Sequence, residues 1–454
     1  MDVLDLTRLQ FAVVTIYHYL FVPLSISLSA TTAGLQIAWM RTGQDRYRQL
    51  TLLVGKLLIV TFAVGVVTGL VQEFQFGLAW SEFARFYGDV FGPTLAIEGM
   101  LAFFLEATFL ALWYFGWDRL SRPVHLATIV VVAVGTLLSA FIILAANSFM
   151  QHPVAFELDP TTGRAHLTSF RELLLNEVNL AAFPHTTAGA IMVGGALLLA
   201  IGAWRRAADV DGAAFATLAR IGAWMTAAGG ALTAITGDHL GKVITQVQPM
   251  KMAAAEALYS TTTGAPFSLF AVGPDFSIEV PRLLSILAYG SPDATVAGID
   301  DLQAQYTAAY GPGSYIPMIP VAFWSFRLMI GVGMLAMLFA VLYLWRTRRG
   351  RQPAAWLIRA AVLLPLLPSA ANSLGWIFTE TARQPWIAFG LSKVADGISP
   401  GLTSGEVLAS LLGFAAVYGV LAVVWLRLVR HLARQPLSKP LNSDAAEPEP
   451  ALSY

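Results

Sequence analysis

Long apolar segments separated by short polar ones dominate this chain. Nine of them reach or exceed the roughly 20 residues that a helix needs to cross the hydrocarbon core of a membrane. They are residues 9–40, 52–78, 94–117, 124–149, 178–204, 216–240, 318–346, 354–380 and 404–432. Pro23 in the first segment and Pro365 and Pro368 in the eighth are tolerable where neighbouring helices satisfy the freed carbonyl groups. The pattern predicts an all-α polytopic membrane protein with about nine transmembrane helices.

Basic residues gather in alternate loops, and this predicts the orientation. The basic set of loops carries Arg41, Arg46, Arg48, Arg119, Arg122, Arg205, Arg206, Arg346, Arg348, Arg349, Arg351, Arg430, Arg434 and Lys439. The opposite loops are longer in total and much poorer in positive charge. Because cytoplasmic loops carry an excess of Lys and Arg, we expect the N-terminus outside and the C-terminus in the cytoplasm.

The segments divide the chain into four regions. Residues 1–240 carry the first six predicted helices, and residues 318–435 carry the last three. Residues 241–317 form an outer loop whose length is uncommon between spans and is often functional. Residues 436–454 are polar, and we expect a disordered cytoplasmic tail.

Composition narrows the chemistry. The chain is 56% hydrophobic and only 12% charged, whereas a soluble domain is about one quarter charged, so we expect a lipid bilayer around it. A net charge of zero provides no basic surface for nucleic acid. The absence of cysteine excludes thiolate-ligated clusters and metals, so any metal must be held by His, Met or carboxylate. The first residues lack a basic stretch followed by a short apolar core, so we expect no cleaved signal peptide.

Two histidines lie inside predicted spans. His18 is in the first and His185 in the fifth, and either one alone could simply bond a neighbouring helix. The small residues 186–189 follow His185 and leave room for a flat, bulky group, or alternatively for close helix packing.

A methionine and an arginine lie close together in the seventh span. Met329 by itself would usually be packing, but Arg327 two residues earlier needs an anion, and a haem propionate is a suitable one. Histidine with methionine is an axial pair for a low-spin haem.

Carboxylates complete the candidate set. Glu98 and Glu106 lie on one side of the third span, which suggests a proton path or cofactor contacts, although each could cap another polar group. Glu380 and Arg383 end the eighth span and could be an interfacial salt bridge. Given the span directions, His18, Glu98, His185, Met329 and Glu380 all fall in the outer half of the membrane. Independent structural roles would scatter such residues, so the convergence favours one shared site.

The chain resembles subunit I of cytochrome bd-type quinol oxidases along essentially its whole length. The resemblance is carried by RLQFAVVTIYHYLFVPL, EFQFG, GPTLAIEGMLAFFLEATF, NSFMQHP, the segment around His185, QPMKMAAAEA, FWSFRLM and ARQPW. The outer loop is similar to the short form of the family's quinol loop, and the sequence looks most like actinobacterial members. One departure is Ala382, where the family's motif has glycine.

The resemblance implies roles for individual residues. His185 and Met329 match the axial ligands of a low-spin haem b, and Arg327 matches an arginine associated with that haem. His18 and Glu380 match axial ligands of two further haems, and Trp376 matches an aromatic residue between haems. Arg383 belongs to the haem-associated motif. Glu98 and Glu106 match carboxylates beside the haem pair, and Lys251 and Glu256 match quinol-loop residues implicated in substrate oxidation.

The implied cofactors are a low-spin haem b, a high-spin haem b and a haem d (cis-haem d hydroxychlorin gamma-spirolactone). Which of the His18 and Glu380 sites holds haem d, and whether haem b replaces it, stays open. The implied partners are subunit II, in some complexes a small single-span subunit, menaquinol or ubiquinol as substrate, and O2. The expected location is the bacterial cytoplasmic (inner) membrane.

The expected reaction is oxidation of quinol at the outer face and reduction of O2 to water with charge separation across the membrane. A proton-coupled secondary transporter also needs buried carboxylates and histidines, but it would predict repeats in two halves, which nine spans without a visible repeat do not offer. A structural subunit without cofactors would not explain the outer clustering.

Overall fold

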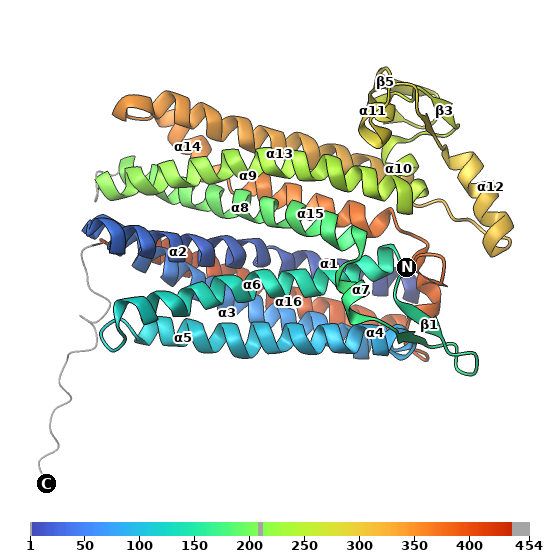
Figure 1. The fold of residues 1–454 in the computed structure, drawn as a ribbon, viewed down its shortest axis with the longest axis horizontal. Coiled ribbons are helices and arrows are strands. Elements are labelled where there is room, and N and C mark those ends of the chain that lie inside the picture. Colours follow the sequence, from blue (N-terminus) through green and yellow to red (C-terminus); the bar gives the residue numbers. More distant parts are fainter. Residues whose placement is uncertain (1, 208–211, 438–454) are drawn as a thin grey trace, which may run out of the picture.

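The computed structural model of the protein describes residues 2–207 and 212–437. Long helices run side by side along one axis (Figure 1), which confirms the all-helical architecture. Eight helices in these residues are long and apolar enough to cross a membrane. The helix α9 (Gly212–Val247) is equally long, packs along α8 (Glu177–Ala207), and corresponds to the remaining predicted span.

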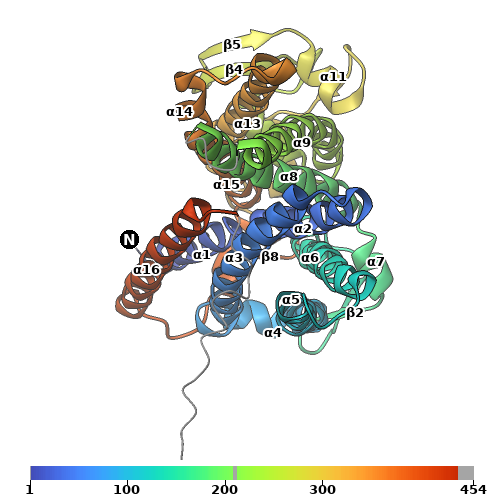
Figure 2. The same ribbon diagram turned by 90° about the vertical axis from the view of Figure 1, so that its left-hand side faces the viewer.

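The other predicted spans also correspond to helices. They are α1 (Val3–Tyr19) with α2 (Val22–Thr42), α3 (Asp45–Leu78), α4 (Ser81–Gly99) with the π-helix η1 (Met100–Glu106) and α5 (Ala107–Phe115), α6 (Arg122–Gln151), α13 (Ile319–Thr347), α14 (Ala355–Leu363) with α15 (Leu366–Thr381), and α16 (Ser404–Arg434). Figure 2 shows α8, α9, α13, α14 and α15 gathered on one side, and α1 to α6 with α16 on the other.

Two of the predicted spans are interrupted at their prolines. In the first span the helix ends at Tyr19 and a new helix begins at Val22, just before Pro23. In the eighth the helix ends at Leu363 and a new one begins at Leu366, just after Pro365. A proline ring blocks one hydrogen bond of an uninterrupted helix, which accounts for a break at these two positions, although Pro93 and Pro184 lie inside unbroken helices.

Glycines bring α8 and α9 into backbone contact. A Cβ on Gly222 would lie 2.3 Å from the backbone nitrogen of Leu199, and one on Gly202 would lie 2.4 Å from that of Ala219. Small residues are what allow helices to approach this closely in a membrane, where apolar area alone drives little association. This closely packed pair carries His185, which lies on α8.

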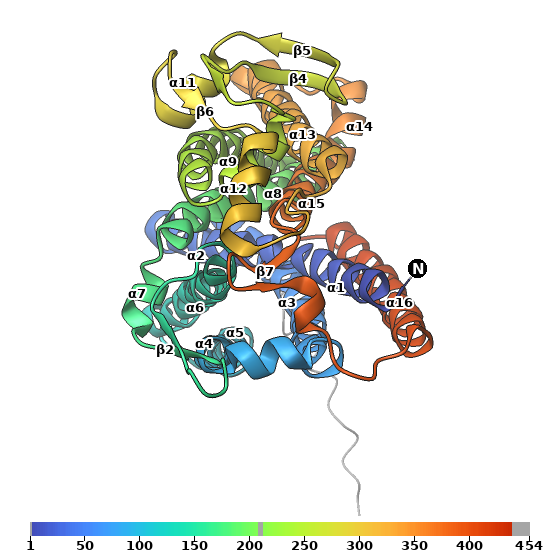
Figure 3. The ribbon, with the colours of Figure 1, turned by 90° about the vertical axis from the view of Figure 1, so that its right-hand side faces the viewer.

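The segment between α9 and α13 folds into a small unit at one end of the bundle (Figure 3). It consists of α10 (Pro249–Glu256), β3 (Thr262–Thr263), β4 (Phe267–Val272), β5 (Phe276–Val280), α11 (Leu283–Tyr289), β6 (Thr295–Val296) and α12 (Ile299–Tyr310). Its strands pair antiparallel, β3 with β6 and β4 with β5. Because α9 continues to Val247, the structured connection begins later than residue 241.

Shorter elements lie between the long helices. They are β1 (Phe156–Leu158), β2 (Ala165–Leu167), α7 (Phe170–Leu174), η2 (Arg348–Gly350), β7 (Trp386–Ala388), β8 (Ser392–Lys393) and η3 (Val394–Gly397). The start of α1 lies at the same end as α10 to α12 (Figure 1). At the opposite end Arg205 donates to the backbone oxygen of Arg434 at 2.8 Å. The predicted tail, 436–454, falls outside the described residues from residue 438 onward.

Candidate functional site

His18 and His185 are each held by one ring nitrogen. His18 Nδ1 is 2.9 Å from Thr68 Oγ1, whose own hydroxyl can donate to the Val64 carbonyl at 3.0 Å. His185 Nδ1 is 3.0 Å from the backbone oxygen of Thr233, which can only accept. The carbonyl partner places the proton of neutral His185 on Nδ1 and leaves Nε2 with a free lone pair, as in histidines that bind a metal; His18 likewise makes its side-chain contact with Nδ1.

Glycines face both rings. A Cβ on Gly69 of α3 would lie 3.1 Å from His18 Cε1, and one on Gly237 of α9 would lie 3.0 Å from His185 Cε1. A third glycine, Gly375 of α15, faces Met329, since a Cβ there would lie 3.0 Å from the sulfur. Each of these three candidate ligands therefore packs directly against a glycine of a neighbouring helix.

His185 and Met329 lie at about the same depth in the bundle. Met337 of α13 packs on Gly230 of the antiparallel helix α9, where an added Cβ would lie 2.8 Å from its Cβ. Two helical turns from that contact, about 11 Å at 1.5 Å per residue, lead to Met329 on one helix and to Gly237 on the other. His185 lies at this level too, because its ring faces Gly237. The side chains of His185 and Met329 can therefore approach one planar group from different helices.

Arg327 forms a buried ion pair with the loop unit. Its Nη2 donates to Glu256 Oε2 at 2.6 Å, and its Nε donates to the Ser268 carbonyl at 2.5 Å. Its Nη1 is buried without a hydrogen-bond partner among the described residues. Arg327 can therefore accept one further anion beside Met329, while Glu256 already holds its other side.

Glu380 is oriented by two donors. Asn147 Nδ2 of α6 donates to Oε1 at 3.0 Å, and Arg383 Nη2 donates to Oε2 at 2.5 Å. Trp376, one turn earlier on α15, contacts Tyr19 edge-to-face at 5.3 Å between ring centroids. The helices that carry His18 and Glu380 are thereby brought together. Ala382 has φ −76°, so glycine is not required at that position.

Glu98 and Glu106 both face α6. Ser139 Oγ donates to Glu98 Oε1 at 2.9 Å, and a Cβ on Gly135 would lie 3.1 Å from Glu106 Cγ. The intervening segment is a π-helix, a form that is frequent at functional sites. Glu73 of α3 lies within hydrogen-bonding reach of Glu98. Sequence reasoning did not select Glu73, although it begins the EFQFG stretch.

Lys251 and Glu256 point to different partners from the same short helix. Lys251 Nζ donates to Gln151 Oε1 at 2.6 Å, whereas Glu256 pairs with Arg327. Burial lowers the pKa of Lys251 to about 7. Burial raises the pKa of Glu256 to about 7, against the opposing effect of Arg327. As pH rises through about 7, Lys251 therefore loses its positive charge and Glu256 gains its negative charge.

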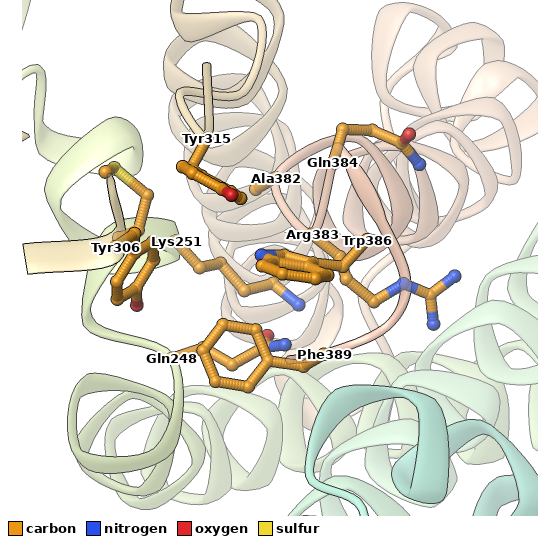
Figure 4. A pocket seen from close by; sticks show the side chains of 10 residues that line it. Gln248, Lys251, Tyr306, Tyr315, Ala382, Arg383, Gln384, Trp386 and Phe389 are labelled. Carbon is orange, nitrogen blue, oxygen red and sulfur yellow. The ribbon is translucent and has the colours of Figure 1, made fainter. Parts of the chain in front are cut away.

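A small pocket, with room for about one water molecule, opens beside Lys251. In Figure 4 Lys251 and Gln248 reach into the space between Tyr306 and Trp386, with Phe389 alongside. Polar atoms of Gln248, Tyr306 and Trp386 are buried there without a hydrogen-bond partner among the described residues. The cavity can therefore bind a small polar group next to a buried lysine.

The residues fit the haem ligands that the resemblance implied. Two histidines present free Nε2 atoms, Met329 lies against a glycine, and Arg327 and Arg383 have unsatisfied buried donors of the kind that carboxylates bind. Sequence reasoning missed the supporting residues. These are Thr68, Gly69, Thr233, Gly237, Gly375, Glu73, Asn147, Gln151 and Ser139. The quoted NSFMQHP stretch contains Asn147 and Gln151 and was the one signal for them.

Comparison with known proteins identifies the family. The sequence matches the family described as "Cytochrome bd terminal oxidase subunit I" over residues 6–437. It is 39% identical over 432 residues to "Cytochrome bd ubiquinol oxidase subunit 1" of Bacillus subtilis (strain 168), covering 93% of this chain and 92% of that one. It is 34% identical over 507 residues to "Cytochrome bd-II ubiquinol oxidase subunit 1" of Escherichia coli (strain K12), covering 95% and 96%.

A solved structure agrees in fold. "The structure of bd oxidase from Geobacillus thermodenitrificans" superposes with a TM-score of 0.87 at 27% identity, covering 95% of this chain and 98% of that one. The family match spans nearly the whole chain, which decides against the secondary transporter that the buried carboxylates alone had left open. The chain therefore belongs to the cytochrome bd oxidase subunit I family and is the catalytic subunit of a bacterial respiratory membrane oxidase.

Proposed function

We propose that this catalytic subunit of a cytochrome bd quinol oxidase, a quinol:oxygen oxidoreductase, holds its haems on four side chains from four helices. His185 Nε2 and Met329 Sδ would bind a low-spin haem b, with Arg327 Nη1 on a propionate. His18 and Glu380 would bind a high-spin haem b and a haem d, one on each. When bound, the haems supply electron transfer from quinol to O2 and an open iron position for O2 reduction.

Quinol would bind at the unit formed by α10 to α12. Lys251 would orient a quinol oxygen from the cavity that it lines, and Glu256 would accept a quinol proton. Glu256 sits against Arg327, two residues before Met329, so its position suits proton acceptance beside the low-spin site.

Glu98 and Glu106 would carry the protons that water formation consumes. Both face α6, with Ser139 bonded to Glu98, so that glutamates and a hydroxyl line one side of that helix. With the N-terminus outside and the C-terminus cytoplasmic, quinol protons would leave outward and consumed protons would enter from the cytoplasm. Each charge moved this way against the membrane potential costs about 2.3 kcal/mol per 100 mV.

Three of the four predicted regions would then have separate roles. Residues 1–240 and 318–435 would hold the haems, and the loop region of 241–317 would bind menaquinol or ubiquinol. Subunit II would complete the enzyme, with a small single-span subunit in some complexes.

One observation carries the haem assignment, and it comes from the contrast between two buried histidines. His185 uses only Nδ1, whereas His125 uses both nitrogens, bonding Gln36 Nε2 at 2.8 Å and the Trp113 carbonyl at 2.8 Å. His125 therefore has no lone pair for a metal and is a matched control.

The test is a pyridine haemochrome count on purified complexes of the wild type, His185→Ala and His125→Ala. We expect b-type haem in the wild type, loss of one haem in His185→Ala, and an unchanged count in His125→Ala. Equal haem contents in the two variants would sink the assignment of His185 as a ligand.

A further inference from the structure

The NSFMQHP stretch at the end of α6 has no part in the function proposed so far. Two of its polar side chains, Asn147 and Gln151, are four residues apart and so lie on the same side of the helix. Gln151 is 1% exposed. A buried amide at this position needs partners for both its oxygen and its nitrogen.

Those partners connect the quinol-loop lysine to Glu380. Lys251 Nζ donates to Gln151 Oε1 at 2.6 Å. Gln151 Nε2 donates to Asn147 Oδ1 at 3.5 Å, one helical turn earlier. Asn147 Nδ2 donates to Glu380 Oε1 at 3.0 Å. Two amides therefore bridge a buried cation and a carboxylate that belong to different parts of the fold.

The chemistry of the two ends fixes the direction of every bond. An ammonium group can only donate, so Gln151 must present its oxygen to Lys251 and its nitrogen to Asn147. Asn147 must then accept with its oxygen, which leaves its N–H to face Glu380. Either amide turned the other way would lose a bond at both of its ends.

Lys251 depends on this bridge. It is 2% exposed, and among the described residues its ammonium forms no ion pair. Its ammonium nitrogen also lies 5.8 Å from the centroid of the Phe378 ring, at cation–π distance. Without the Gln151 oxygen the ammonium would lose its hydrogen-bond acceptor beside the small pocket that it lines.

We propose that Gln151 is a positioning residue that holds Lys251 at the quinol end with its oxygen and, through Asn147, orients the Glu380 carboxylate with its nitrogen. This inference rests on the proposed function, in which Lys251 orients quinol and Glu380 binds a haem. It adds a physical link between the two sites through residues to which the proposed function gives no role.

The two functions of the amide can be separated by substitution. Gln151→Leu removes both, whereas Gln151→Glu keeps an acceptor for Lys251 and, as a carboxylate, loses the donor toward Asn147. The matched control is Gln36→Leu, since Gln36 is also a buried glutamine with two hydrogen bonds, to His125 and Trp113, and belongs to neither site.

The measurements are the KM and kcat for quinol, turnover with a small water-soluble electron donor, and the optical band of the high-spin haem. We expect Gln151→Leu to raise the quinol KM at least about tenfold, the loss expected when a charged donor loses its hydrogen bond. It should also shift the high-spin band while the small donor is still oxidised. Gln151→Glu should restore the KM but retain the spectral shift, and Gln36→Leu should change neither.

A Gln151→Leu enzyme with the wild-type KM and spectrum would overturn the inference. If that variant fails to assemble, Gln151→Glu decides, because a raised KM or an unshifted band in that variant would contradict the separation. Failure of the proposed function is distinguishable, since the wild-type complex would then lack haem or quinol turnover altogether.

Discussion

The Glu256–Arg327 ion pair allows a quantitative prediction for the loop unit. Glu256 is 1% exposed, and its Oε2 accepts from Arg327 at 2.6 Å and from the Ser268 backbone at 3.3 Å. Replacing it with glutamine leaves the arginine buried without its carboxylate. Breaking a buried pair from one side costs about 3–5 kcal/mol.

The expected cost lies near the lower limit of that range. Arg327 would keep the bond to the Ser268 carbonyl, and its guanidinium carbon lies 4.2 Å and 4.7 Å from the ring centroids of Phe267 and Phe323. We therefore expect about 3 kcal/mol for Glu256→Gln when it is measured above pH 7, where Glu256 is a carboxylate. At about 1.4 kcal/mol per factor of ten, this corresponds to roughly a hundredfold more frequent opening of the loop unit.

Hydrogen–deuterium exchange measures that opening directly. Amides of α10 and β4 should lose about a hundredfold in protection in Glu256→Gln, while those of α8 should not change. The double variant Glu256→Leu with Arg327→Leu removes both charges and should recover part of the protection. Unchanged exchange in Glu256→Gln, or greater exchange in the double variant, would refute the stabilising role of the pair.

Three further predictions concern activity and haem binding. First, kcat/KM for quinol should peak near pH 7, because Glu256 becomes a carboxylate and Lys251 loses its charge as pH rises through about 7. Lys251→Arg, which stays charged, should flatten the alkaline limb, and an unchanged profile would contradict the role of Lys251. Second, Gly237→Ala should displace the His185 ring and lower low-spin haem content, whereas Gly241→Ala, whose Cβ would meet only Met252 Cε at 3.9 Å, should not, as a haemochrome count can show. Third, Glu106→Gln should slow O2 reduction after the haems are reduced, by about 100-fold or more as for a lost proton-transfer group. Flow–flash absorbance with normal oxidation kinetics would remove Glu106 from the route.

The sequence predicted the helices better than the contacts between them. Apolar length located the spans, because hydropathy acts within one segment, whereas Pro23 and Pro365 were expected to be tolerated and the helices break beside both. The π-helix before Glu106 has no such local signal.

The sequence predicted which residues belong to the candidate site, but not which of them form hydrogen bonds or ion pairs with one another. Arg327 was expected to meet a haem propionate, and the structure shows that it also pairs with Glu256, 71 positions earlier in the chain. Lys251 and Gln151 are 100 positions apart, and Asn147 and Glu380 are 233 apart. Such pairings are set by the packing of distant helices, which residue spacing does not encode.

The most direct test of the haem assignment compares two methionines on α13 in the reduced-minus-oxidised spectrum. Met329 faces Gly375 at the level of His185, and Met337 packs on Gly230 two turns away. We predict that Met329→Leu loses the low-spin haem b band and quinol oxidation, while Met337→Leu keeps both. A Met329→Leu spectrum identical to the wild type, with normal turnover, would contradict the account.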